Sequence, residues 1–256
     1  MQKGLLIGLI AAYASGCSPY LHSPPARMVP LEAAKSLPKG DFAIQGALAG
    51  GVAVWGPSVG AGTAQGRYGF GRGFEGAAEV GFAALGARDT EWTTSASRSM
   101  FAARAGFKYE AASWFAVQAG FGGGVSAAGG FISPDAGVIF SYQGERVVPF
   151  FSGGFFYSLP LAEKDIVFRD GDRVEVLRAD KTLGYQGNIG LRVPFTKSRS
   201  DSPRSAVMFG YRLVVAVHNE EYGRGPDMYN LFVFGLDLVF RKDKSPGNAG
   251  RRWKMH

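Results

Sequence analysis

Residues 182–194 read TLGYQGNIGLRVP, and this stretch has the clearest structural pattern in the chain. Large apolar side chains fall on alternate positions along residues 183–193, and Gln186, Asn188 and Arg192 fall between them. Successive side chains of a β-strand point to opposite faces, so a period of two predicts a strand. We therefore expect residues 182–194 to form a strand with one apolar and one polar face.

The same period of two recurs along the rest of the chain. Each repeat is long enough to cross a membrane as a tilted β-strand, which takes about 9–11 residues. The register of residues 147–158 stays open, because this segment is apolar on both faces. Together with residues 182–194 the pattern predicts ten strands, the other nine being residues 41–54, 62–72, 74–86, 99–109, 113–125, 135–143, 147–158, 206–217 and 228–240.

The two faces of these segments differ in a way that indicates a membrane. The apolar face is rich in Phe and Tyr, whereas the opposite face carries mainly Gly, Ala, Gln and single charges. Tyr109, Trp114 and Tyr157 stand at segment ends, as aromatic residues do at the two surfaces of a membrane. A water-soluble barrel has the same period with its apolar face inward, and that alternative stays open. No apolar run reaches the roughly 18 residues of a spanning helix, so a helical membrane protein is not expected.

Short and long connections alternate between the predicted strands. The short ones lie near residues 72–73, 110–112 and 144–146, and the long ones include residues 87–98 and 126–134. Bacterial outer-membrane barrels alternate short periplasmic turns with longer external loops in the same way. Both ends of the barrel sequence are therefore predicted to lie on the periplasmic side.

Two other connections need separate treatment. Residues 195–204 should form a short turn but are too many for one, so either strands are misread there or the turn carries an insertion. The longest external connection contains Asp170-Gly171, a strong hairpin-turn dipeptide. We expect residues 166–177 to form a β-ribbon that projects beyond the membrane.

The first residues have the properties of an export signal. A basic residue precedes an apolar stretch, residues 4–14, whose length suits a signal peptide and is too short to span a bilayer. The following Ala14-Ser15-Gly16-Cys17 resembles the lipobox of bacterial lipoproteins, in which the cysteine is acylated and becomes the first mature residue. That resemblance implies a covalent acyl anchor, such as palmitate, at Cys17, which is the only cysteine of the chain. Ordinary secretory cleavage after Gly16 is the alternative.

The sequence divides into four parts. Residues 1–16 are the predicted signal peptide, and residues 17–40, which are rich in proline, are predicted to be a periplasmic tether. Residues 41–241 form the barrel, and residues 242–256 are predicted to be a basic, disordered tail. Ser18 stands where an aspartate would retain such a lipoprotein at the inner membrane, so the resemblance implies the outer membrane of a Gram-negative cell.

Nine charged residues fall on the polar face and are expected to line the lumen. A barrel of about ten strands has little free space inside, since water-filled porins use about 16–18 strands. A buried charge is costly unless it is paired, so we expect ion pairs that fill the lumen. A selective pore or a ligand-binding lining is the alternative. The nine residues are Arg67, Glu75, Glu79, Arg104, Lys108, Asp135, Arg192, Arg212 and Asp237.

No residue pattern indicates catalysis or a cofactor. The strongest candidate is His218, beside Glu220 and Glu221, but it lacks the positioned partners that acid–base chemistry needs. Three dispersed histidines and one cysteine offer no metal site. The net charge is +7, but the Lys and Arg residues are scattered along the chain and are densest in the tail, so no nucleic-acid partner is predicted. We expect no enzyme, and a hydrolase centred on His218 is the least favoured alternative.

These patterns resemble bacterial outer-membrane β-barrel proteins as an architecture, without a motif that indicates one family. The resemblance implies an all-β fold, namely a closed antiparallel up-and-down transmembrane β-barrel of about ten strands. It also implies outer-membrane lipid as the immediate partner of the protein, with the oligomeric state left open. For function we expect a structural or surface-interaction role, with a small-solute channel or a ligand-binding barrel as the alternative.

Overall fold

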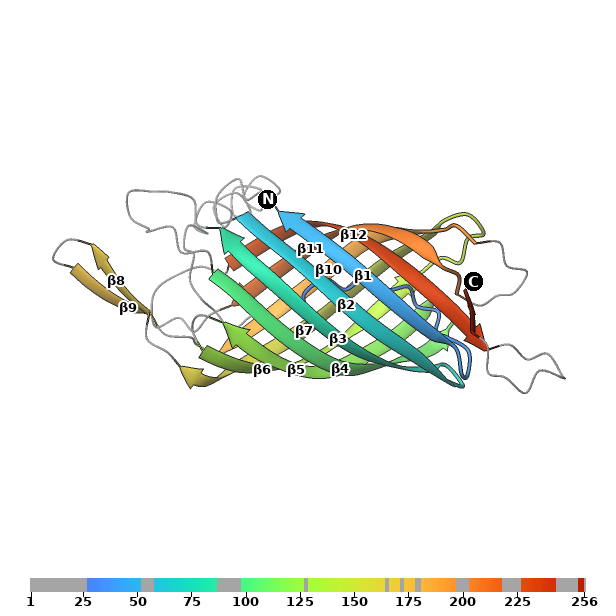
Figure 1. Ribbon diagram of the computed structural model, residues 1–256, viewed down its shortest axis with the longest axis horizontal. Coiled ribbons are helices and arrows are strands. Elements are labelled where there is room, and N and C mark those ends of the chain that lie inside the picture. Colours follow the sequence, from blue (N-terminus) through green and yellow to red (C-terminus); the bar gives the residue numbers. More distant parts are fainter. Residues whose placement is uncertain are drawn as a thin grey trace, which may run out of the picture.

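The computed structural model is a closed β-barrel, seen from the side in Figure 1. Among the residues that it describes, no helix is long and apolar enough to cross a membrane. The structure describes residues 27–51, 58–86, 98–126, 129–163, 166–170, 173–177, 181–196, 203–217, 227–242 and 253–255.

Ten antiparallel strands form the barrel wall, and each is hydrogen-bonded to its neighbours in chain order. Pairing of the first strand with the last closes the wall, for example Phe42 with Phe240. The predicted fold class is therefore confirmed. The strands are β1 (Phe42–Gly51), β2 (Ser58–Gly71), β3 (Phe74–Gly86), β4 (Arg98–Ala112), β5 (Phe115–Ser126), β6 (Gly129–Ser141), β7 (Val148–Glu163), β10 (Thr182–Pro194), β11 (Ala206–Val217) and β12 (Asp227–Lys242).

The apolar face of the strands points away from the barrel axis. Ile189 of β10 and Phe232 of β12 are 62% and 72% exposed, whereas Asn188, one position before Ile189, is 4% exposed. A water-soluble barrel would bury the first two side chains and expose the third. The outer surface is therefore built for contact with lipid, as predicted.

The structure also settles the register of β7, which the sequence left open. Phe151 and Phe155 are exposed on the outer face, and Phe150 and Phe156 are buried on the inner face. Large apolar residues fit on the inner face of β7 because glycines at the paired positions of the neighbouring strand leave space for their rings. The ring of Phe156, for example, lies where a side chain at Gly184 would have to be.

Short turns join the strands at one end of the barrel, which we call the turn end; the opposite end is the loop end. The β2–β3 turn contains Arg72 and Gly73 at φ 55° and 81°, the positive φ values of a type I′ hairpin. The β4–β5 turn is Ser113-Trp114, and the predicted turn at residues 110–112 is wrong. The register shifts between Glu110 and Ala112, and this irregularity lets β4 continue to the later turn.

The long connection after β10 joins two strands that are direct neighbours in the barrel wall. Pro194 pairs directly with Ala206, so β10 and β11 are neighbours and the extra residues extend their turn. The predicted ribbon at residues 166–177 is present as β8 (Ile166–Asp170) paired with β9 (Arg173–Leu177). Figure 1 shows this hairpin beyond the loop end of the barrel.

Part of the predicted disordered tail is a short strand, β13 (Trp253–Met255). It pairs with residues 240–242 of β12. On one edge of β12, the neighbouring β11 begins opposite Asp237, so the last residues of β12 lack a partner on that edge. The tail supplies the missing partner, which satisfies backbone hydrogen-bonding groups that would otherwise be unpaired.

Candidate functional site: a charged lumen occupied by residues 27–40

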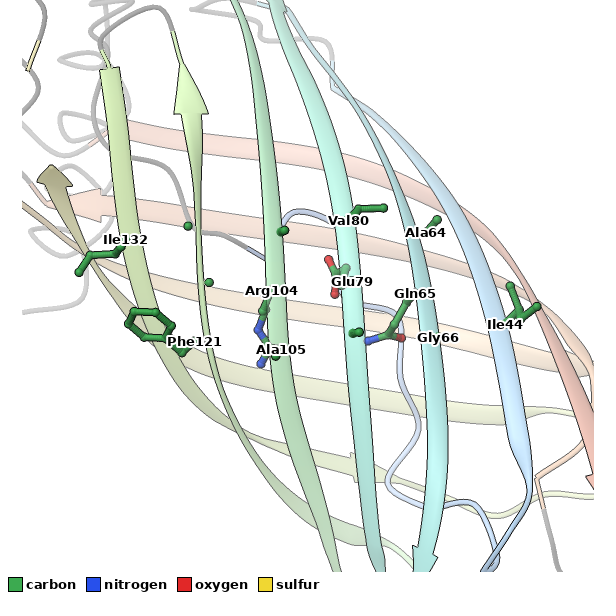
Figure 2. Close-up of a pocket in the computed structure, with 14 residues that line it drawn as sticks. Ile44, Ala64, Gln65, Gly66, Glu79, Val80, Arg104, Ala105, Phe121 and Ile132 are labelled. Atoms are coloured by element: carbon green, nitrogen blue, oxygen red, sulfur yellow. The ribbon is translucent and has the colours of Figure 1, made fainter. Parts of the chain in front are cut away.

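All nine charged residues assigned to the lumen are buried, each with 8% exposure or less. Period-two alternation places them on the inner face of their strands, opposite the lipid-facing side chains. Figure 2 looks at part of this wall, where Gln65 of β2, Glu79 of β3 and Arg104 of β4 lie on neighbouring strands. Most of the nine form ion pairs, which fall into three groups.

The first group is a chain of ion pairs across five strands. Asp237 of β12 accepts hydrogen bonds from Arg67 Nη2 at 2.6 Å and from Arg192 Nη2 at 2.9 Å. Arg67 Nη1 also lies 3.3 Å from Glu75 Oε1, and Lys108 Nζ lies 3.1 Å from the same oxygen. None of the strands that carry Asp237, Arg67 and Arg192 are direct neighbours, so these pairs tie separate parts of the wall together.

The second group is a bidentate pair that spans β5. Arg104 of β4 donates to both carboxylate oxygens of Asp135 on β6, from Nε and Nη2, each at 2.6 Å. The guanidinium lies against Gly106 and Gly120, where any Cβ atom would collide with it. Inward-facing glycine on β4 and β5 is therefore what allows Arg104 to reach Asp135.

Residues 27–40, predicted to belong to a periplasmic tether, lie inside the barrel instead. Met28, Leu31 and Leu37 are 4% exposed or less, and Glu32 is 6% exposed. In Figure 2 the segment is the pale blue trace behind β2, β3 and β4. The apolar side chains of this segment could not stay in water at low cost, and the lumen buries them.

The segment runs along the barrel axis from the turn end toward the loop end. At the turn end, Gly40 N donates to Gly69 O at 2.8 Å. Strand β3 starts at the turn end, and its contacts with the segment follow this direction. Leu37 N donates a hydrogen bond to Glu75, near the start of β3. Farther along β3, Arg27 forms an ion pair with Glu79, and Met28 lies beside Gly81. The chain therefore occupies the lumen from its turn end to beyond its middle before β1 begins.

The third group of ion pairs joins this segment to the wall. Arg27 donates from Nη2 to Glu32 Oε1 and from Nη1 to Gln118 Oε1, each at 2.5 Å, and its Nε lies 3.7 Å from Glu79. Glu32 also accepts a hydrogen bond from Gln65 Nε2 at 2.9 Å. Arg27 and Glu32 therefore belong to the charged lumen together with the wall residues.

Arg212 depends on the segment in a different way. It is 1% exposed, and its Nη2 donates to Gln186 Oε1 at 2.7 Å and to the carbonyl oxygen of Arg27 at 2.9 Å. A buried cation needs hydrogen-bond acceptors when it has no close carboxylate. The backbone of the segment provides one of them.

Sequence reasoning does not find Arg27 and Glu32, because a proline-rich segment without periodicity predicts a tether. One available signal was the apolar content of residues 28–37, where Met28, Val29, Leu31 and Leu37 would be exposed in a tether. A second signal was the many Ala and Gly residues on the inner face, which leave space that something has to fill.

The outer wall carries a shallow apolar depression of about 830 Å³ over β1–β6. Small outward residues such as Ala64, Ala78 and Ala103 form its floor, and Val80 and Phe121 are among the larger side chains around it. These side chains are labelled in part in Figure 2. Gln65, Glu79 and Arg104 also line it, but their buried side chains belong to the lumen, so the outward surface of the depression is apolar.

Several predicted functional residues lie outside the residues that the structure describes. These are the candidate acyl site Cys17, the signal peptide of residues 1–16, and His218 with Glu220 and Glu221. Within the described part of the chain, no group of three or more His, Cys, Asp and Glu side chains could hold a metal ion. Among the residues that the structure describes, the charged lumen is the candidate functional site.

Comparisons with known proteins give a fold but no family. No protein-family model and no curated protein matches the sequence. Among solved structures, the translocator domain of the autotransporter NalP from Neisseria meningitidis matches with a TM-score of 0.52 at 12% identity, over 79% of this chain and 88% of that chain.

Two smaller similarities are to Neisserial surface protein A and to the outer-membrane protein OprG from Pseudomonas aeruginosa. The first has a TM-score of 0.29 at 11% identity, over 77% of this chain and 94% of that chain. The second has a TM-score of 0.29 at 10% identity, over 80% of this chain and 99% of that chain. The predicted architecture, a closed β-barrel like that of the NalP translocator domain, is confirmed at the level of the fold by the first of these three structures and by the strand order.

Proposed function

We propose that this chain is an integral outer-membrane β-barrel that is closed at rest and has a non-enzymatic, structural or surface-interaction role. The supporting observation is the filled lumen: most of residues 27–37 are buried among the inward side chains, and the segment is hydrogen-bonded to them. A barrel filled in this way gives a small solute no continuous water path. The part of the molecule offered to partners is then its outer surface and its loop end.

Conductance in a planar lipid bilayer tests this proposal. The full-length chain should insert without producing channel steps, because ions cannot pass a lumen that is filled by packed side chains. Insertion should be verified by protease protection of the barrel strands, so that silence reflects a closed lumen and not a missing protein. Regular stepwise openings from the inserted full-length chain would contradict the proposal and favour a small-solute channel.

We further propose that Cys17 carries an acyl anchor in addition to the barrel. The support is the resemblance of residues 14–17 to a lipobox, together with the absence of any other cysteine. A Cys17→Ala variant should lose incorporation of labelled palmitate and still stay in the membrane pellet after alkaline extraction, because the strands hold it there. A variant that keeps the label would overturn the acyl anchor, and a variant released by extraction would overturn the integral barrel.

A further inference from the structure

We propose that the lumen is a binding site for a peptide segment, that its resident ligand is the chain's own segment of residues 27–40, and that departure of this segment opens a pore. This inference rests on the proposed closed state and adds what keeps the barrel closed. The segment is then an exchangeable ligand of the lumen and not a fixed part of the core.

The wall recognises the backbone of the segment directly. Residues 27–40 form no strand ladder with the wall, so their polar groups need side-chain partners. Glu75 accepts from Leu37 N at 2.8 Å, Glu110 from Ser36 N at 2.6 Å, and Ser141 from Ala34 N at 3.0 Å.

Two cations of the wall complete this backbone recognition by binding carbonyl oxygens. Lys108 Nζ lies 3.3 Å and 3.4 Å from the oxygens of Ala33 and Lys35, and Arg212 binds the oxygen of Arg27. Side chains from β3, β4, β6 and β11 thus bind the backbone of one segment that has no regular secondary structure and forms no ladder with the wall.

Side chains of the segment add specificity. Leu31 is 1% exposed and lies between Gly210 and Gly235, where an added Cβ at either position would be 3.0 Å from a Leu31 methyl group. Leu37 packs with Ala43 and Val239. The site therefore selects a peptide with a large apolar residue at position 31 and, from the ion pairs described above, opposite charges at positions 27 and 32.

The wall is complete without the segment. Its ladder closes through β1 and β12, and no strand pairing involves residues 27–40. The ion pairs of Asp237 with Arg67 and Arg192, and of Arg104 with Asp135, also join wall residues only. In an empty lumen these ion pairs would remain, whereas Glu79 and Arg212 would lose their contacts with Arg27. A lumen lined by these polar groups would take up water in place of the segment.

The connection to β1 allows such an exchange. Gly40 has φ 85°, a conformation that favours glycine, and Asp41 N donates to Pro38 O at 3.0 Å in the same turn. This turn redirects the chain from the lumen into the wall. Movement about Gly40 would break the bond from Gly40 N to Gly69 O, but the β1–β2 pairing, which begins at Phe42 and Tyr68, can stay formed.

The test measures conductance of a variant that lacks residues 27–40 and then adds the missing segment as a synthetic peptide. The deleted barrel should give stepwise channel openings, and the peptide RMVPLEAAKSLPKG should close them in a concentration-dependent way. A matched peptide with Leu31→Glu should need at least a tenfold higher concentration, which corresponds to about 1.4 kcal/mol of binding free energy. Equal block by the two peptides would overturn the proposed site.

A second variant decides the question if the deleted barrel does not insert. The full-length Leu31→Glu chain keeps every wall residue, but it places a charge against the Gly210 and Gly235 backbone, and should open intermittently. Silence of this variant, or of an inserted deleted barrel, would overturn the exchangeable ligand and leave the proposed closed barrel intact. A conducting full-length chain without substitutions would instead overturn the proposed function.

Discussion

The Asp237→Asn variant should lose about 3–5 kcal/mol of unfolding free energy, as expected when one member of a buried ion-pair group is removed. Asp237 is 2% exposed and is the common partner of Arg67 and Arg192. An asparagine fills the same space but carries no charge, so two buried guanidinium groups lose their closest anion. Arg67 would retain Glu75, at 3.3 Å, whereas Arg192 would retain no close carboxylate among the described residues.

Urea unfolding in lipid vesicles, followed by tryptophan fluorescence, measures this loss. Glu145→Gln is the matched control, because it makes the same chemical change in an exposed turn and should shift the unfolding free energy by less than about 0.5 kcal/mol. Adding Arg192→Gln to Asp237→Asn should restore part of the stability by removing one uncompensated cation. Equal stability of Asp237→Asn and Glu145→Gln would show that the ion pairs of the lumen do not stabilise the barrel.

The barrel wall could be predicted from the sequence because each strand meets two different environments. Lipid on one side and a packed lumen on the other impose a period of two, which is visible within a single strand such as residues 182–194. The same reasoning places Arg212 and Asp237 inward without reference to any partner. Neighbouring strands also follow one another in the chain, so strand order needed no long-range information.

The partners of the lumen charges could not be predicted in the same way. Arg67 and Asp237 are 170 residues apart, and Arg104 reaches Asp135 across an intervening strand. These pairs depend on barrel closure and on the shear between strands, which period-two alternation does not determine. The sequence therefore predicts which charges are enclosed, but leaves open which of them pair.

The lumen segment was missed for a related reason. Residues 27–40 have no period, since each side chain contacts a different part of a curved wall. Prolines at positions 30 and 38 suggest an extended, solvated chain when the sequence is read locally. In the lumen the same prolines are suitable, because each removes an N–H group that would otherwise need a partner there.

The central claim is that the apolar side of each strand contacts lipid, and Ile189→Arg tests it most directly. Ile189 lies in the middle of β10, on the outer face, between Phe151 and Tyr211 of the neighbouring strands. Arginine on the lipid face should cost about 2–4 kcal/mol near the membrane midplane and about 0–1 kcal/mol near its surface. Val193→Arg, on the same face near the turn end of β10, is therefore the matched control.

The measurement is urea unfolding of the two variants in the same lipid vesicles. We expect Ile189→Arg to lose at least about 2 kcal/mol more unfolding free energy than Val193→Arg, because only the first arginine is held deep in hydrocarbon. Equal and small losses for both would mean that the outer face of β10 contacts water, and the membrane barrel would then be contradicted.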